Sequence, residues 1–160
     1  RRRTPTRHMS ESKIIADCER QGASYEDPNF PLASATNVPG ATWQRPAHAL
    51  GVESPTLFAP EGRGTAAFVM GASRLVTSWL LDALAALAVR PAQLERLFVS
   101  TRGSKHGVYT LQLFVGDQWL QITVDDRLPC DEHGALLYSR SSCAGELWVS
   151  LVEKAYAKLL

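Results

Sequence analysis

The chain has 160 residues, of which 45% are hydrophobic and 21% are charged, and its formal net charge is +1. This length and composition are typical of one globular domain with a hydrophobic core. A net charge so close to zero gives no electrostatic basis for binding nucleic acid or an anionic membrane surface. The arginines crowded into the first seven residues are an exception, and we interpret residues 1–12 as a disordered leader.

The cysteine content and the hydropathy pattern indicate the compartment. Three cysteines, Cys18, Cys130 and Cys143, occur without an apolar signal segment. An odd and sparse set of cysteines is typical of a reducing compartment, so we expect a cytoplasmic location. The most apolar stretch, residues 75–89, contains Asp82 and is shorter than the roughly 20 residues that a membrane-spanning helix needs. The sequence therefore predicts no membrane span.

The segment from residue 13 to residue 60 is dense in proline-containing turn signals. A short helix is expected over residues 14–21, followed by an irregular layer without long regular elements. Four aromatic side chains are expected to pin this layer onto the core: Tyr25, Phe30, Trp43 and Phe58.

Residues 75–88, LVTSWLLDALAALA, are apolar on almost every side. Such a pattern predicts a buried central helix rather than an amphipathic helix at the surface. The pair Arg90-Pro91 ends this helix, because the residue before a proline avoids the helical conformation. A second, short helix is expected over residues 92–98.

Two segments rich in β-branched and aromatic residues, 107–115 and 118–124, flank the pair Gly116-Asp117. Apolar and aromatic runs on both sides of a glycine-containing turn predict a β-hairpin. A loop is expected to follow from residue 125 to residue 144.

The last fifteen residues, 146–160, predict an amphipathic helix. Its apolar side chains share one face, while Glu153, Lys154 and Lys158 lie off that face. The segment has no C-cap glycine and stops on two leucines. We therefore expect the helix to have been cut from a larger domain.

Several segments together resemble the protease core of the calpain family of cysteine peptidases. They are SYEDPNFP at 24–31, TWQRP at 42–46, WLLDALAALA at 79–88, HGVYTLQLFVGDQWLQITVDDRLPC at 106–130, ALLYSRSS at 135–142 and GELWVSLVEKAYAKLL at 145–160. The resemblance implies an α+β, papain-like fold and identifies residues 13–160 as its first, mainly helical subdomain. The second subdomain carries the catalytic histidine and asparagine in this family, and it is expected to be absent from the chain.

The resemblance also places the family's catalytic residues. The family pattern Q-G-x-x-G-D-C-W-L-L aligns with ASRLVTSWLL at 72–81, so Ser78 takes the position of the catalytic cysteine. Ala72 takes the position of the oxyanion-hole glutamine, or Met70 does if two residues are inserted. A cysteine at a helix N-terminus beside a histidine rests as a thiolate, whereas a serine hydroxyl needs an aligned base. We therefore expect no proteolytic activity. Degenerate catalytic positions of this kind resemble those of many trypanosomatid calpain-like proteins.

A calcium site is implied by the same resemblance. Glu146 matches the family's glutamate ligand, the carbonyls of Gly62 and Gly64 match its backbone ligands, and Val69 occupies the aspartate position. Calcium takes six to eight oxygen ligands and usually more than one carboxylate. We therefore expect a weak or empty site and no firmly bound cofactor.

Other candidate sites are weaker. Cys130, His133 and Cys143 are too few and unsuitably spaced for zinc. The four histidines are all expected at the surface: His8, His48, His106 and His133.

Three interpretations of function stay open. The first is an inactive calpain-like domain that acts as a structural or interaction module. The second is an active calcium-dependent cysteine-type endopeptidase fragment in which Ser78 serves as the nucleophile, and the third is a calcium-responsive module without catalysis. In each case we expect a protein partner or polypeptide substrate, together with the remainder of the chain's own calpain core.

Overall fold

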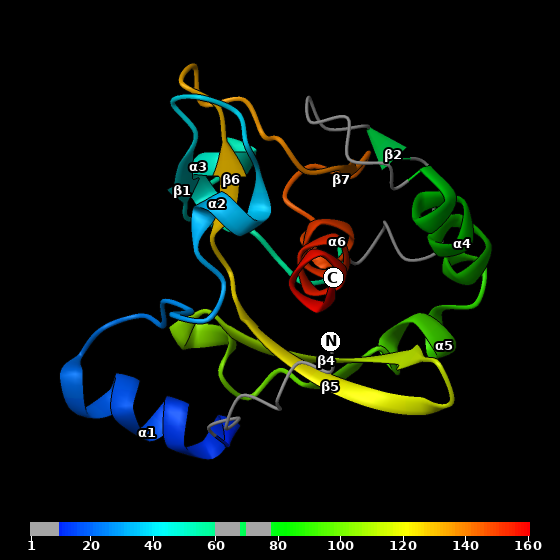
Figure 1. Cartoon of the computed structure of the whole chain (residues 1–160), viewed down its shortest axis with the longest axis horizontal. Coiled ribbons are helices and arrows are strands. Elements are labelled where there is room, and N and C mark those ends of the chain that lie inside the picture. The colour runs from blue at the N-terminus through cyan, green and yellow to red at the C-terminus, as the bar shows by residue number, and fades with distance from the viewer. Residues whose placement is uncertain (1–9, 60–67, 70–77) are drawn as a thin grey trace.

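A computed structural model of the chain describes residues 10–59, 68–69 and 78–160. Helices and small antiparallel sheets alternate along the chain, which confirms the predicted α+β class. The helices are α1 (Glu11–Gln21), α2 (Leu32–Ala35), α3 (Pro46–Leu50), α4 (Ser78–Ala88), α5 (Pro91–Glu95), the 3₁₀ helix η1 (Ser104–His106) and α6 (Trp148–Leu159). The strands are β1 (Thr42–Gln44), β2 (Phe68–Val69), β3 (Phe98–Ser100), β4 (Val108–Val115), β5 (Gln118–Asp125), β6 (Leu128–Cys130) and β7 (Arg140–Ser141). Figure 1 shows α6 in the middle, with the other elements around it.

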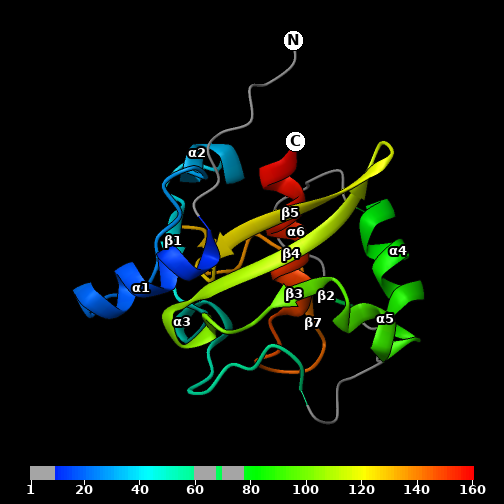
Figure 2. The ribbon, with the colours of Figure 1, turned by 90° about the horizontal axis from the view of Figure 1, so that it is seen from below.

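The predicted β-hairpin is confirmed. Strands β4 and β5 pair without interruption from Val108–Asp125 to Val115–Gln118, and Gly116 adopts the left-handed conformation that the tight turn requires. Strand β3 joins the free side of β4, so the order in the sheet is β3-β4-β5 (Figure 2).

The helix expected over residues 92–98 is correct only in its first half. Helix α5 ends at Glu95, and Phe98 begins strand β3 instead of ending a helix. Phe98 pairs with Leu111 of β4, so tertiary pairing overrides the local preference at this point.

The loop expected over residues 125–144 contains two short strands that the sequence did not reveal. Strand β6 pairs antiparallel with β1, and β7 pairs antiparallel with β2. Two- and three-residue strands carry no periodic pattern, and their partners lie far away in the chain. The β1–β6 pairing ties the proline-rich N-terminal layer to the segment that leads into α6, and the β2–β7 pairing ties residues 68–69 to the same segment.

The N-terminal layer is pinned by aromatic side chains, as predicted. Phe30 is buried, and its ring centroid lies 6.0 Å from that of Trp43. Phe58 packs edge-on against Phe98 at 5.5 Å between centroids. The helix expected from residue 14 begins earlier, at Glu11, so residues 11 and 12 belong to it and not to a leader. Residues 1–9 of the expected leader lie outside the described residues.

The expected assignment of the buried central helix needs a correction. Helix α4 buries Leu80, Leu81 and Leu84, but Trp79 is 52% exposed and Val89, just after the helix, is 69% exposed. Helix α6 is the enclosed one, with every side chain from 148 to 155 buried. A long apolar run therefore did not identify the central helix, because enclosure depends on how many other elements surround a helix.

The prediction that Glu153 and Lys154 lie off the buried face is wrong. Their exposed fractions are 2% and 0%. The amine of Lys154 donates to the carboxylate of Asp125 at 2.5 Å and to the carbonyl oxygens of Asp125 and Arg127. It also lies 4.2 Å from the centroid of the Trp43 ring, within range of a cation–π interaction. All three protons of the buried ammonium group therefore have oxygen acceptors.

The charges of this pair follow from their surroundings. Burial lowers the pKa of Lys154 to about 8, an effect that Asp125 partly offsets, so the lysine is charged at neutral pH. Burial by itself raises the pKa of Asp125, but the Lys154 charge and the hydrogen bonds from Arg127 outweigh it and lower that pKa. The backbone N–H of Asp27 donates to the same carboxylate at 2.6 Å. The ion pair therefore joins α6, β5 and the N-terminal layer.

Two neighbouring contacts extend this network. The amine of Lys158 donates to Asp27 at 2.5 Å and to the carbonyl oxygen of Thr123 at 2.6 Å. The Arg45 guanidinium donates to Asp126 at 2.5 Å and to the carbonyl oxygen of Tyr25 at 3.1 Å. The irregular layer is thus fastened to the hairpin by charged side chains as well as by aromatic packing.

Replacing Lys154 with methionine tests how much the fold depends on this pair. The substitution leaves the Asp125 charge buried without its lysine, so we expect the free energy of unfolding in urea to fall by about 3 kcal/mol or more. The matched control is Lys105→Met, which breaks an exposed pair with Glu19 at 67% and 53% side-chain exposure. The control is expected to cost less than about 1 kcal/mol. Equal losses in the two variants would contradict a special role for the buried pair.

Candidate functional site

Ser78 is the first residue of α4, and its side chain is exposed. The next residue, Trp79, packs edge-on against Tyr156 of α6 at 5.3 Å between ring centroids. The sequence did not identify Tyr156 as part of this site. Its position on the apolar face of the last helix was the one feature that could have indicated it. The start of α4 is thus held against the central helix while Ser78 faces solvent.

The position of Ser78 has a defined electrostatic character. The first N–H groups of a helix have no partner inside the helix, so this end carries a partial positive charge. Such a setting lowers the pKa of a thiol and favours a thiolate. A serine hydroxyl does not ionise at neutral pH in this setting and requires a base that removes its proton.

No histidine of the described residues forms a hydrogen bond or ion pair with Ser78. His48 lies in α3, the Nε2 atom of His106 lies 3.7 Å from Glu19, and that of His133 lies 3.6 Å from Glu132. His106 is only 18% exposed, so the expected surface position is wrong for this residue.

Several residues of the expected site cannot be placed. Ala72 and Met70, the two candidates for the oxyanion position, lie outside the described residues, as do Gly62, Gly64 and His8. Val69, which takes the family's aspartate position, belongs to β2 and pairs with Arg140.

Glu146 is the one predicted calcium ligand whose side-chain surroundings the structure describes. The residue is 1% exposed, and its Oε1 atom accepts a hydrogen bond from the N–H of Ala59 at 3.0 Å. The Oε2 atom is buried and has no hydrogen-bond partner among the described residues. A buried carboxylate oxygen without a partner is costly, and a bound cation removes that cost. The carboxylate therefore fits a cation ligand.

A complete metal site does not follow from this single carboxylate. Within residues 10–59, 68–69 and 78–160, no cluster of three or more histidine, cysteine, aspartate or glutamate side chains is arranged to hold a metal ion.

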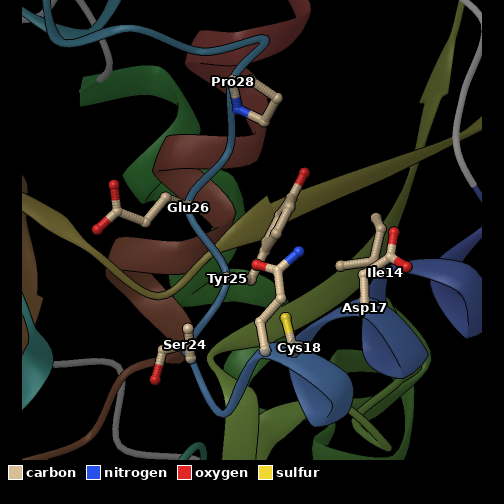
Figure 3. A pocket seen from close by; sticks show the side chains of 9 residues that line it. Ile14, Asp17, Cys18, Ser24, Tyr25, Glu26 and Pro28 are labelled. Carbon is tan, nitrogen blue, oxygen red and sulfur yellow. The ribbon is translucent and has the colours of Figure 1, made fainter.

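A cavity of about 410 Å³ lies between α1 and the segment that follows it. Its lining residues are Ile14, Asp17, Cys18, Gln21, Ala23, Ser24, Tyr25, Glu26 and Pro28 (Figure 3). Burial, and next the Asp17 charge, raise the pKa of the Cys18 thiol, which makes it a poor nucleophile. Burial and the neighbouring Asp27 likewise raise the pKa of Tyr25. The cavity includes neither Ser78 nor Glu146, and it holds no activated group.

No helix of the described residues has both the length and the apolar content that a membrane crossing requires.

Comparison with known proteins gives a consistent family assignment. Residues 25–160 match the family described as calpain family cysteine protease. Human calpain-12 is 33% identical over 96% of this chain, and the match covers 22% of calpain-12. The bovine calpain-2 catalytic subunit is 31% identical over 89% of the chain and 22% of its own length. The rice calpain-type cysteine protease ADL1 is 36% identical over 54% of the chain and 4% of its own length. The chain thus spans about a fifth or less of the relatives it matches.

Replacing Trp79 with alanine tests whether this ring holds the start of α4 in place. The change removes a half-exposed ring and its edge-on contact, so we expect the free energy of unfolding to fall by about 1–2 kcal/mol. The matched control, Tyr156→Phe, keeps both rings and is expected to change stability by less than about 0.5 kcal/mol. Urea titration followed by circular dichroism measures both. An unchanged Trp79→Ala variant would show that the contact does not hold α4.

Proposed function

Because this chain belongs to the calpain family of cysteine proteases, we propose that it is a calpain-like domain without peptidase activity that acts as a structural or interaction module. The observation that carries the proposal is Ser78, an exposed hydroxyl at the first residue of α4, in the position where the family resemblance puts the catalytic cysteine. A hydroxyl in this setting is not a nucleophile without a base.

The energetic argument combines two losses. The first is the thiolate, which a helix N-terminus stabilises and which serine does not form at neutral pH. The second is the oxyanion donor, because the resemblance puts Ala72, or Met70 if two residues are inserted, in the position that the family fills with glutamine, and neither side chain can donate a hydrogen bond. Removal of one such donor lowers the rate by a factor of roughly 10²–10³. An active endopeptidase based on Ser78 would need to overcome both losses.

Exposed apolar side chains at the two ends of α4 support an interaction role. Trp79, in the first turn, is 52% exposed beside its contact with Tyr156, and Val89, just after the last residue of the helix, is 69% exposed. We propose that these residues contact a polypeptide partner, with the remainder of a calpain core as the first candidate. Cys18 and Cys130 form no disulfide bond, which is compatible with the reducing, cytoplasmic compartment that we propose for the protein.

The absence of peptidase activity is tested by assaying the chain beside its Ser78→Ala variant. With millimolar calcium present, we expect no cleavage of casein above the rate of this variant, and no labelling of Ser78 by a fluorophosphonate. Calcium-dependent cleavage that Ser78→Ala abolishes would overturn the proposal.

A cysteine variant separates the residue type from its setting. In Ser78→Cys, we expect the rate of iodoacetamide modification to report a thiol pKa below the usual value of about 8.5, because of the helix N-terminus. Wild-type protein is the background control, since Cys18 and Cys130 are buried and Cys143 is partly buried. A thiol pKa at or above the usual value would show that the setting itself no longer favours an anion.

A second candidate function is a calcium-responsive module without catalysis, which the unpartnered Oε2 atom of Glu146 favours. Calcium would supply a positive charge to this buried oxygen and connect it with other oxygen ligands. Glu146 is a single carboxylate, so affinity in the millimolar range is the strongest that we propose.

Thermal unfolding with and without calcium tests this second candidate. At about ten times a millimolar Kd, calcium is expected to add roughly 1.4 kcal/mol to the free energy of unfolding. Glu146→Gln keeps the shape and the hydrogen bond to Ala59 but removes the charge, so it should abolish the increase. Magnesium at the same concentration controls for ionic strength. A calcium effect that survives Glu146→Gln, or that magnesium reproduces, would exclude Glu146 as the ligand.

A further inference from the structure

Strand β5 is an edge strand along its full length. It pairs with β4 on one side, and no described strand pairs with it on the other. Figure 2 shows β5 on the outer side of the hairpin, with β4 between it and β3. The part of such an edge that other side chains leave open presents main-chain donors and acceptors that can bind another extended chain.

The register identifies which residues present these groups. Asp126 donates its N–H to the carbonyl oxygen of Gly107 at 2.9 Å. In an antiparallel ladder every second pair is hydrogen-bonded, so Val124, Ile122, Leu120 and Gln118 of β5 direct their main-chain groups toward β4. The residues between them, Trp119, Gln121 and Thr123, therefore direct their N–H and C=O groups away from β4. The 3.0 Å contact between the hydroxyls of Thr110 and Thr123 fits this register, because non-hydrogen-bonded pairs bring side chains closer.

The available edge is short and well defined. Lys158 of α6 donates to the carbonyl oxygen of Thr123 at 2.6 Å, which occupies the edge on that side. On the other side, the turn at Gly116-Asp117 ends the strand. Trp119 and Gln121 are left as the two residues that present both main-chain groups.

The side chains of this region have no charge that would oppose pairing. Residues 118–124, QWLQITV, contain no charged residue, proline or glycine. Natural edge strands usually carry lysine or proline as protection against pairing, and this strand has neither. Trp119 is 59% exposed and stacks edge-on against Phe114, itself 58% exposed, at 5.3 Å between centroids. An aromatic surface thus accompanies the open edge.

We propose that β5 pairs antiparallel with β5 of a second copy of this chain, about a two-fold axis at Leu120. In that register Trp119 lies opposite Gln121 of the partner subunit, and Gln121 lies opposite Trp119 of the partner subunit. Two such pairs form two main-chain hydrogen bonds each. The half-buried Leu120 meets its symmetry equivalent on the core side, and the contact between Lys158 and Thr123 remains intact.

A second copy suits this edge better than a loose peptide. Its strand is already extended and held by β4, so pairing requires little further ordering, whereas a disordered segment loses conformational entropy on binding. The two edges are identical and uncharged, which is the condition for a self-complementary two-fold contact. Because only the tip of the hairpin takes part, the interface is small and the Kd is expected to be weak, on the order of 100 µM.

Sedimentation equilibrium of the 160-residue chain at roughly 10–500 µM, a range that brackets this Kd, tests the proposal. We expect a monomer–dimer equilibrium, and we expect Gln121→Lys to raise the Kd by at least about tenfold, because a lysine at the edge opposes pairing. The matched control is Gln93→Lys, the same substitution at an exposed position of α5. Hydrogen exchange at low and high concentration should show slower exchange of the Trp119 and Gln121 amides in the dimer.

Two outcomes would overturn the proposal. One is a chain that stays monomeric over the whole concentration range. The other is a dimer that forms through a different surface. Such a dimer would show equal changes of Kd in Gln121→Lys and Gln93→Lys, or unchanged exchange of the hairpin amides on dimer formation. Urea titration of both variants checks that neither substitution unfolds the chain.

Discussion

The arrangement of this chain depends on the burial of one charged lysine. Lys154 is fully enclosed, and its amine is satisfied by the carboxylate and carbonyl oxygen of Asp125 and by the carbonyl oxygen of Arg127. Taking both charges of an ion pair out of water costs several kcal/mol, and only good geometry with full hydrogen bonding repays it. Helix α6 therefore has one position against β5 in which this charge is tolerated, and the other elements are arranged around that position.

The network also explains how an irregular N-terminal layer becomes part of the core. This layer has few regular hydrogen bonds of its own, but Asp27 connects it to the core twice. The backbone N–H of Asp27 donates to Asp125, and its carboxylate accepts from Lys158. The Trp43 ring of the same layer lies against the Lys154 amine. Each of these contacts joins segments that are distant in the sequence. The layer, the hairpin and α6 are consequently expected to unfold together rather than one by one.

The proposed loss of chemistry and the retention of the fold are compatible because they involve different helices. Ser78 begins α4, which packs on one side only, whereas the buried charges belong to α6 and β5. An exposed residue at a helix start can change without leaving a cavity or an unpaired charge in the core. Glu146 differs, since its buried carboxylate lies directly before α6 and contacts the backbone at Ala59. The structural consequences of substitution are therefore larger at the candidate calcium ligand than at the candidate nucleophile.

The sequence by itself determined the elements with a clear local pattern and the family. The turn at Gly116-Asp117 specified the hairpin, the apolar spacing of residues 146–160 specified α6, and the strings around Ser78 placed that residue at a helix start. Only the tertiary structure decided which helix is enclosed, how β6 and β7 pair, and that Lys154, Glu153 and Glu146 are buried. Helix and turn preferences arise from neighbours within a few residues, so a single sequence reveals them. Burial of a charge depends on partners such as Asp125 and Trp43, which folding alone brings within reach.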